Sequence, residues 1–170
     1  MIHGYCFGGA FTPVIACDFA IAAEDAIFGL SEVNWGVIPG GLVSWAVTAA
    51  LGYRDAIYYA VTGDRFTGME AAAMKFVNKS VPPEQLREET MKLARQLFTA
   101  ALLATGLVAV RYTKEAVRSV RGMTQDQAHD YLKVKSEAIK GGDPEGGRKK
   151  AMKMFLDEKS FKPGLGDYNR

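Results

Sequence analysis

Charge is distributed unevenly along this chain, and this distribution limits what its first third can fold into. Residues 1–53 contain no lysine or arginine and only four acidic residues, which gives a net charge of −4. Residues 54–170 hold all 21 basic residues and the other 15 acidic residues, which gives +6. The first segment is also rich in glycine and aliphatic residues. We therefore expect it to form protein interior from its first residues onward.

The overall composition is typical of an ordered globular chain. Hydrophobic residues make up 48% of the 170 residues, and the 18 glycines follow no repeating period. The charge-free segment 33–53 has the length of a membrane helix, but Asn34, Pro39 and several glycines interrupt it, so we predict no membrane span. Cys6 and Cys17 are too few for a disulfide framework. Because the N-terminus lacks the basic segment of a signal peptide, we expect reduced core thiols in a cytoplasmic protein.

Two kinds of secondary structure follow each other along the chain. Residues 1–80 alternate short apolar runs with glycine turns, which predicts an α/β region. Residues 81–170 carry apolar residues at helical spacing with charges between them, which predicts a helical region. In the first region we expect strands at 2–5, 18–22, 26–30 and 77–81 and helices at 11–17, 42–51, 54–61 and 69–76. In the second region we expect helices at 84–103, 104–120, 124–139 and 144–156. Thr67 and Thr124 are placed to cap the helices predicted at 69–76 and 124–139.

A glycine turn between a strand and a helix is the first candidate for chemistry. Gly8, Gly9 and Ala10 stand between the first predicted strand and a helix that carries Pro13 in its first turn. Glycines let a ligand approach the backbone, and the N–H groups at a helix start can hold a phosphate or a developing oxyanion. The alternative is a tight turn that only connects the strand to the helix.

Glu32 is the second candidate, because it stands between two apolar segments. The strand predicted at 26–30 precedes it, and a stretch containing Trp35 follows it. A carboxyl group in such surroundings could give or take a proton near neutral pH. The alternative is a glutamate that caps a helix or is solvated, which is the commoner fate of an isolated glutamate.

The sequence gives little support for other kinds of functional site. The two cysteines lack metal-ligand spacing, and His3 and His129 are far apart in the chain, so we predict no metal site. The sequence contains no G-x-S-x-G segment, which excludes the serine-hydrolase elbow. The net charge of +2 is modest and no RNA- or DNA-binding motif occurs, so we expect no nucleic-acid partner.

Taken together, these segments resemble the enoyl-CoA hydratase/isomerase (crotonase) superfamily. The resemblance is carried by HGYCFGGAF at 3–11, ACDFAIA at 16–22 and FGLSEVNWGVIPG at 28–40. The segment LSEVNWG and the tail FLDEKSFKPGL at 155–165 are similar to one branch, the p-hydroxycinnamoyl-CoA (feruloyl-CoA) hydratase/lyases. The resemblance covers nearly all of this chain and corresponds to the later part of a family member.

The resemblance implies a fold and an activity. The fold would be the later part of a crotonase-like ββα spiral in residues 1–80, followed by a helical trimerisation region in residues 81–170. The activity would be hydration of a hydroxycinnamoyl-CoA thioester and retro-aldol cleavage to acetyl-CoA and an aromatic aldehyde such as vanillin, in phenylpropanoid degradation. The partners would be the acyl-CoA substrate and further copies of the chain in a homotrimer or hexamer. Coenzyme A would enter as part of the substrate, with no separate cofactor.

The resemblance also implies roles for individual residues. Glu32 matches the catalytic acid/base, the N–H of Gly9 matches one of two oxyanion donors, and Thr12 takes a position where simple hydratases carry a second glutamate and this branch usually carries serine. The positions that match substrate-binding residues are Tyr131, Trp35, Gly8, Phe155 and Lys159. Tyr131 would meet the phenol of the substrate or, alternatively, would be an aromatic that packs between helices.

Two further expectations follow from the resemblance. It places the second oxyanion donor N-terminal to the first residue of this chain, and the loss of one such donor costs about 10²–10³ in rate. Two other functions therefore stay open: hydration of aliphatic enoyl-CoA substrates, and a non-catalytic protein that assembles or binds coenzyme A.

Overall fold

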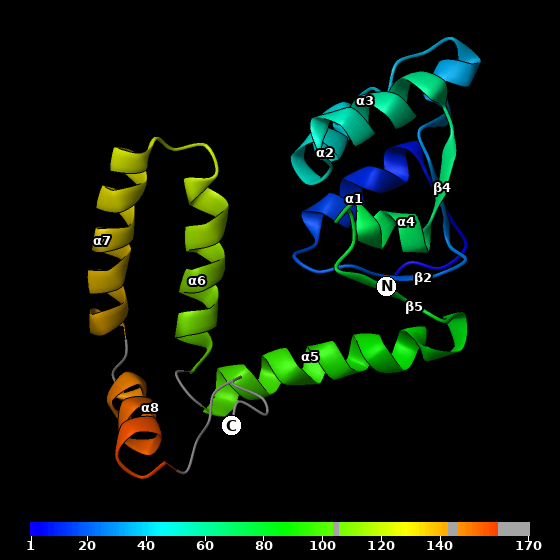
Figure 1. Ribbon diagram of the computed structural model, residues 1–170. Helices are drawn as coiled ribbons and strands as arrows, with labels where there is room; N and C mark the ends of the chain where they lie inside the picture. Colours follow the sequence, from blue (N-terminus) through cyan, green and yellow to red (C-terminus); the bar gives the residue numbers. More distant parts are fainter. Residues whose placement is uncertain (104–105, 143–145, 160–170) are drawn as a thin grey trace. The chain divides into compact units, whose positions relative to one another are not determined.

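A computed structural model gives the fold of residues 1–103, 106–142 and 146–159. The chain forms two compact units, Met1–Lys92 and Leu93–Arg170. The first unit is α/β and the second is helical in its described part (Figure 1). The order predicted from the sequence, an α/β region followed by a helical one, is confirmed.

Short strands and helices alternate in the first unit. They are β1 (Tyr5–Phe7), η1 (Gly8–Ala10), α1 (Phe11–Ala16), β2 (Ile21–Ala23), β3 (Ile27–Gly29), η2 (Ser31–Trp35), α2 (Val43–Ala50), α3 (Tyr53–Thr62), β4 (Arg65–Thr67), α4 (Gly68–Ala73), β5 (Lys79–Val81) and η3 (Pro83–Gln85), where η marks a 3₁₀-helix. The helix α5 (Leu86–Leu103) begins in this unit.

The pairing of β1 with β3 decides which loops lie next to each other. These two strands are parallel, with Phe7 opposite Gly29, and β4 adds to β3 in the antiparallel direction. Because parallel strands end at the same edge of a sheet, η1 and η2 leave the sheet side by side. Gly29 permits the close pairing, since a Cβ built on it would lie 2.5 Å from the ring of Phe7. A second sheet pairs β2 with β5.

The structure differs from the sequence analysis at several strands. β2 begins at Ile21 rather than at residue 18, and β5 begins at Lys79 rather than at residue 77. The first strand begins at Tyr5 rather than at residue 2, and Ile2 forms only an isolated bridge with Ala22. The strand β4 was not predicted, because its three residues include Arg65 and Thr67 and show no apolar run. The helix start predicted at Thr67 is confirmed, because the Thr67 side chain accepts from the N–H of Glu70 and the Glu70 carboxylate accepts from the N–H of Thr67.

Four phenylalanines form the centre of the first unit. Phe28 of β3 stacks on Phe66 of β4 with ring centroids 5.3 Å apart, and Phe11 of α1 lies edge-on to both rings. Phe76, which follows α4, approaches Phe11 to 4.9 Å. The rings are almost fully buried. This cluster fixes α1 against β3, which leads into η2, and against β4, which follows α3.

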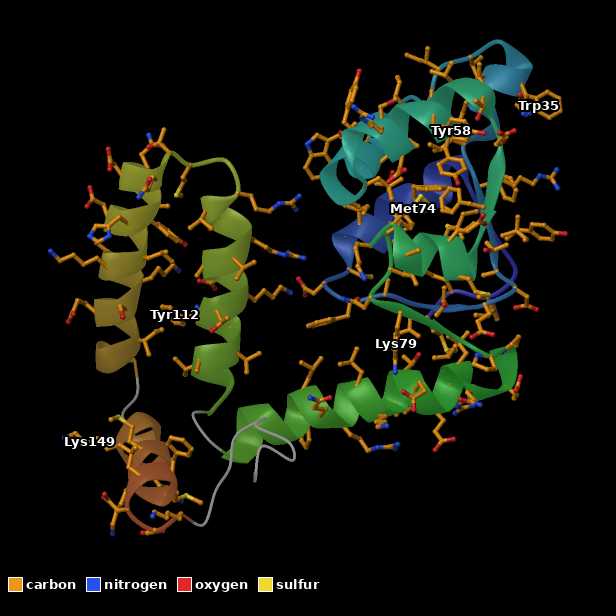
Figure 2. All side chains as sticks on the ribbon, in the orientation of Figure 1. Trp35, Tyr58, Met74, Lys79, Tyr112 and Lys149 are labelled. Atoms are coloured by element: carbon orange, nitrogen blue, oxygen red, sulfur yellow. The ribbon has the colours of Figure 1, made fainter. Side chains whose placement is uncertain are left out.

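The second unit contains a helical hairpin. Its helices are α6 (Gly106–Val120), α7 (Gln125–Gly141) and α8 (Gly147–Leu156), together with the later part of α5. α6 and α7 lie side by side (Figure 1), and Thr124 caps α7 as predicted, in a capping box with Gln127. Between the two helices, the Lys135 ammonium lies 2.5 Å from the Glu115 carboxylate and 4.7 Å from the centre of the Tyr112 ring (labelled in Figure 2).

Within residues 1–103, 106–142 and 146–159, no helix combines the length and the apolar character needed to cross a membrane.

Loss of one core ring should destabilise the first unit strongly. Phe66→Ala removes a side chain that is 1% exposed and stacked on Phe28, and such a cavity costs about 3–5 kcal/mol. Phe19→Ala is the control, because Phe19 is 48% exposed and should cost less than about 0.5 kcal/mol. Urea unfolding followed by circular dichroism measures both free energies of unfolding. Equal midpoints for the two variants would contradict the assignment of this core.

Candidate active site around Glu32

The glycine turn forms the start of a short helix, as the sequence indicates. Phe7 ends β1 in an extended conformation, Gly8 takes a left-handed φ of +47°, and the η1 turn passes directly into α1. The N–H of Phe11 donates to the carbonyl oxygens of Gly8 and Gly9. Gly9 is the second residue of this helical start, and N–H groups at such positions have no acceptor within the helix. Because no atom lies within 4 Å of a Cβ built on Gly9, a ligand can reach this backbone.

The carboxyl group of Glu32 packs directly on this turn. A Cβ built on Gly8 would lie 2.8 Å from Oε1 of Glu32 and 3.3 Å from its Cδ. The carboxyl group therefore occupies the space that any side chain at position 8 would need. The two candidates that the sequence singled out separately, 24 residues apart, meet in the structure because η1 and η2 follow paired parallel strands.

One oxygen of this carboxyl group is buried without a partner. Oε2 of Glu32 is shielded from solvent and accepts no hydrogen bond from the described residues. Leaving a polar atom in this condition costs about 1–3 kcal/mol, and such atoms in a folded protein call for an explanation. A carboxyl oxygen that is kept free beside a helix start is available to exchange a proton with a bound molecule.

The neighbouring site residues of the first unit differ in exposure. Thr12 lies half-buried in the first turn of α1. Trp35, on the same 3₁₀ turn as Glu32, is 79% exposed, and its ring projects outward from the unit (Figure 2). An apolar cavity of about 140 Å³ is lined by Leu30, which directly precedes η2, and by side chains of α2 and α3. Gly8, Gly9, Thr12, Glu32 and Trp35 thus all belong to the first unit.

The other three site residues predicted from the sequence belong to the second unit. Tyr131 of α7 donates its hydroxyl to Oγ of Ser119 on α6 over 3.1 Å, and the Lys135 ammonium lies 5.6 Å from its ring centre. These contacts are those of a helix-packing aromatic, one of the two alternatives for Tyr131. Phe155 lies on α8 and is 40% exposed, and Lys159 follows this helix. Residues 160–165 of the tail segment lie outside the described residues.

Two basic side chains of the hairpin pair with the carboxylate of Glu115. The hydrogen bond from Lys135, followed by the one from Arg111, holds the pKa of Glu115 below its usual range. The same hydrogen bond raises the pKa of Lys135. Glu115 is therefore ionised at neutral pH and holds α6 and α7 together rather than acting as a proton donor.

The prediction of two core thiols is confirmed for Cys6 and wrong for Cys17. Cys6 is 3% exposed, and burial raises its pKa from 9.0 to about 11. Cys17 is exposed because it lies at the C-terminal cap of α1, where the chain leaves the helix in an extended conformation. Within the described part of the chain, no three side chains of the metal-ligating types gather into a cluster.

One contact of the site was not found from the sequence. A Cβ built on Gly63, at the end of α3, would lie 2.7 Å from Oδ1 of Asn34, two residues beyond Glu32. Gly63 has a left-handed φ of +69°, and a glycine after a helical run is the usual signal for such a helix end. The signal predicts the helix end, but nothing in the sequence predicts that Asn34 packs on it.

A sequence model of the enoyl-CoA hydratase/isomerase family matches residues 1–163, nearly the whole chain. The chain belongs to this family. The crotonase-like fold class expected from the sequence is thereby confirmed. Solved structures agree with the match. The chain superposes on an enoyl-CoA hydratase subunit from Geobacillus kaustophilus with a TM-score of 0.79 and 31% identity, over 94% of this chain and 58% of that one. For an enoyl-CoA hydratase from Mycobacterium marinum the TM-score is 0.78 and the identity 27%, over 94% and 61%.

Curated relatives of this family member include several enzymes named for CoA thioesters. A hydroxycinnamoyl-CoA hydratase-lyase from Pseudomonas fluorescens is 49% identical over all 170 residues of this chain and 60% of its own length. A carnitinyl-CoA dehydratase from Salmonella arizonae is 33% identical over 78% of this chain and 49% of its own length. The chain thus spans between about half and three fifths of the length of these relatives.

Filling the space at position 8 should disturb the site. Gly8→Ala places a methyl group 2.8 Å from Oε1 of Glu32 and gives a left-handed φ to a residue with a Cβ. We expect the variant to lose about 1–3 kcal/mol of stability. In thermal unfolding its midpoint should fall below that of Gly9→Ala, where a Cβ meets no atom within 4 Å. A Gly8→Ala variant as stable as Gly9→Ala would contradict the contact.

The two thiols should differ in reactivity. At pH 8 the high pKa of Cys6 keeps it almost entirely in the unreactive thiol form, whereas Cys17 is exposed. Mass spectrometry after brief iodoacetamide treatment should find one alkyl group on the folded chain and two on the urea-unfolded chain. The Cys17→Ser variant should take up almost none when folded. Rapid labelling of Cys6 in that variant would contradict its burial.

Proposed function

We propose that this protein hydrates the double bond of a hydroxycinnamoyl-CoA thioester, such as feruloyl-CoA, and cleaves the adduct to an aromatic aldehyde and acetyl-CoA. The observation that carries the proposal is the packing of the Glu32 carboxyl group on Gly8, with Oε2 buried and free of partners beside the Gly9 turn. The 49% identity to a hydroxycinnamoyl-CoA hydratase-lyase over the whole chain supports this substrate class over the wider family.

In the first step, Glu32 takes a proton from water as the oxygen attacks the β-carbon of the thioester. The electron pair of the double bond moves toward the thioester carbonyl, whose oxygen gains negative charge. The Gly9 N–H is proposed to donate to this oxygen, where one such donor contributes about 10²–10³ in rate. The protonated Glu32 then gives this proton to the α-carbon, which yields the β-hydroxy adduct and restores the carboxylate. Thr12 offers a hydroxyl on the same helix turn to orient the water.

In the second step, the β-hydroxyl group loses its proton to the same carboxylate. The bond between the α- and β-carbons breaks, the β-carbon leaves as the aldehyde, and the electron pair forms the enolate of acetyl-CoA. The Gly9 N–H again stabilises the oxygen of this enolate. Glu32 gives the proton that it took from the hydroxyl group to the α-carbon, which yields acetyl-CoA. With feruloyl-CoA the aldehyde is vanillin. Water is the only co-reactant, so no redox cofactor is required.

Roles in substrate binding are proposed for five residues. Gly8 and Trp35 would line the reacting end of the thioester, and Tyr131 would meet the phenol of the hydroxycinnamoyl group. Phe155 and Lys159 would hold the adenine and phosphates of coenzyme A, because an exposed aromatic ring stacks on a base and an ammonium group pairs with phosphate.

Assembly into a homotrimer or hexamer is proposed as well. In the helical region that the resemblance assigns to trimerisation, Phe98, Val117 and Val134 are each more than 60% exposed. Such a surface is typical of a protein–protein interface. Sedimentation velocity of the purified chain measures the oligomeric state, and a monomer at micromolar concentration would contradict it.

Glu32→Gln should remove the proposed activity and leave the fold intact. The amide keeps the shape of the carboxyl group but cannot take a proton, so we expect kcat with feruloyl-CoA to fall by about 10²–10⁴. Glu88→Gln, a change at an exposed residue of α5, should keep the wild-type kcat. Vanillin formation is followed by its absorbance, and circular dichroism checks that both variants are folded.

The outcomes separate the proposed function from its alternatives. Turnover of crotonyl-CoA without turnover of feruloyl-CoA would overturn the lyase proposal in favour of an aliphatic enoyl-CoA hydratase. No turnover of either substrate by a folded wild-type chain, together with coenzyme A binding that Glu32→Gln does not change, would favour the non-catalytic alternative.

A further inference from the structure

We propose that Asn34 and Gly63 are positioning residues that hold Glu32 on the glycine turn. The contact between them is the second of two places where the η2 turn rests on a glycine. This inference depends on the proposed function for its link to catalysis, because it concerns the residue that would exchange the proton. The contact itself is independent of any activity.

The side-chain amide of Asn34 covers the Cα of Gly63. A Cβ built on Gly63 would lie 2.7 Å from Oδ1, 2.8 Å from Nδ2 and 3.0 Å from Cγ of Asn34. Oδ1 and Nδ2 are closer than real Cβ atoms approach a neighbour, so the amide fills the space of the missing side chain. This packing is the same as that of the Glu32 carboxyl group on Gly8.

Backbone hydrogen bonds within the η2 turn connect Asn34 to Glu32. The N–H of Gly36 donates to the carbonyl of Val33, and the N–H of Val37 donates to the carbonyl of Glu32, over 3.1 and 3.2 Å. These bonds bracket Asn34, so the segment from Glu32 to Val37 is a single hydrogen-bonded turn. These hydrogen bonds link the backbone that carries Asn34 to the backbone that carries Glu32.

The end of α3 that supports Asn34 is fixed on its other side. The Tyr58 hydroxyl (labelled in Figure 2) donates to the Asp64 carboxylate over 2.8 Å, and the N–H of Asp64 donates to the Thr62 hydroxyl. The next residue, Arg65, begins β4 and pairs with Gly29 of β3. The backbone at Gly63 cannot move to make room for a side chain without disturbing these bonds.

These contacts close a ring through the site. The chain leaves β3 at Gly29, enters η2, touches α3 through Asn34 and Gly63, and returns through β4 to β3. Glu32 lies within this ring and faces Gly8 on the neighbouring strand end. The position of its carboxyl group is therefore determined by two glycine contacts on different elements, one from η1 and one from α3.

The test compares Gly63→Ala with a variant that relieves the clash. We expect Gly63→Ala to lower kcat for feruloyl-CoA by between about tenfold and 10²-fold with little change in KM, because a displacement near 1 Å at the reacting group has this effect. Asn34→Ala removes the amide, so the double variant should regain the kcat of Asn34→Ala alone. Gly4→Ala is the matched control, since its φ of +66° is nearly that of Gly63 and its Cβ meets no atom within 4 Å. It should lose stability and keep kcat.

Three results would overturn the inference. They are an unchanged kcat in Gly63→Ala, a double variant no more active than Gly63→Ala, and an equal loss of kcat in Gly4→Ala. The last result would assign the effect to backbone strain in general.

Amide hydrogen exchange separates this inference from the proposed function. Exchange of the Gly36 and Val37 amides should be faster in Gly63→Ala than in the wild type and should return toward the rate of Asn34→Ala in the double variant. If this pattern is found and the wild type does not turn over feruloyl-CoA, the proposed function fails and the positioning contact stands. If the wild type is active and neither exchange nor kcat responds, the positioning inference fails alone.

Discussion

The parallel pairing of β1 with β3 is the constraint on which the rest of the site depends. It places Phe7 opposite Gly29, so the two strands end together and their following loops leave the sheet as neighbours. One loop becomes a helix start, where the first N–H groups have no acceptor within the helix, and the other carries Glu32. The buried phenylalanine cluster then fixes α1 to β3 and β4. The stability of the core and the geometry of the site therefore have the same physical origin.

Glycine enters this site where another side chain would occupy space that a neighbour already fills. The space of a side chain at Gly8 is filled by the carboxyl group of Glu32. In the same way, the amide of Asn34 fills the space at Gly63, and the ring of Phe7 fills the space at Gly29. The result is a loop held closely on both sides, with one carboxyl oxygen buried and left without a partner. Burial of the surrounding apolar side chains offsets the free-energy cost of that oxygen. Oε2 of Glu32 therefore keeps its capacity to accept a hydrogen bond from a bound molecule.

The second unit is held together differently. Across its hairpin, Lys135 pairs with Glu115 and makes cation–π contacts with Tyr112 and Tyr131. Tyr131 therefore has partners within its own unit, and Ser119 accepts its hydroxyl hydrogen. Any contribution of Tyr131 to substrate binding would have to be compatible with this packing.

The sequence alone determined the α/β-then-helical order, the helix caps at Thr67 and Thr124 and the two segments around Gly8 and Glu32, because these depend on local patterns of apolar residues, glycine and capping side chains. It did not determine β4, whose three residues become a strand only by pairing with β3, or the exposure of Cys17. Nor could it determine that Glu32 rests on Gly8 and Asn34 on Gly63. Those contacts join residues more than twenty positions apart, and only the register of the parallel strands and the end of α3 bring them within contact distance.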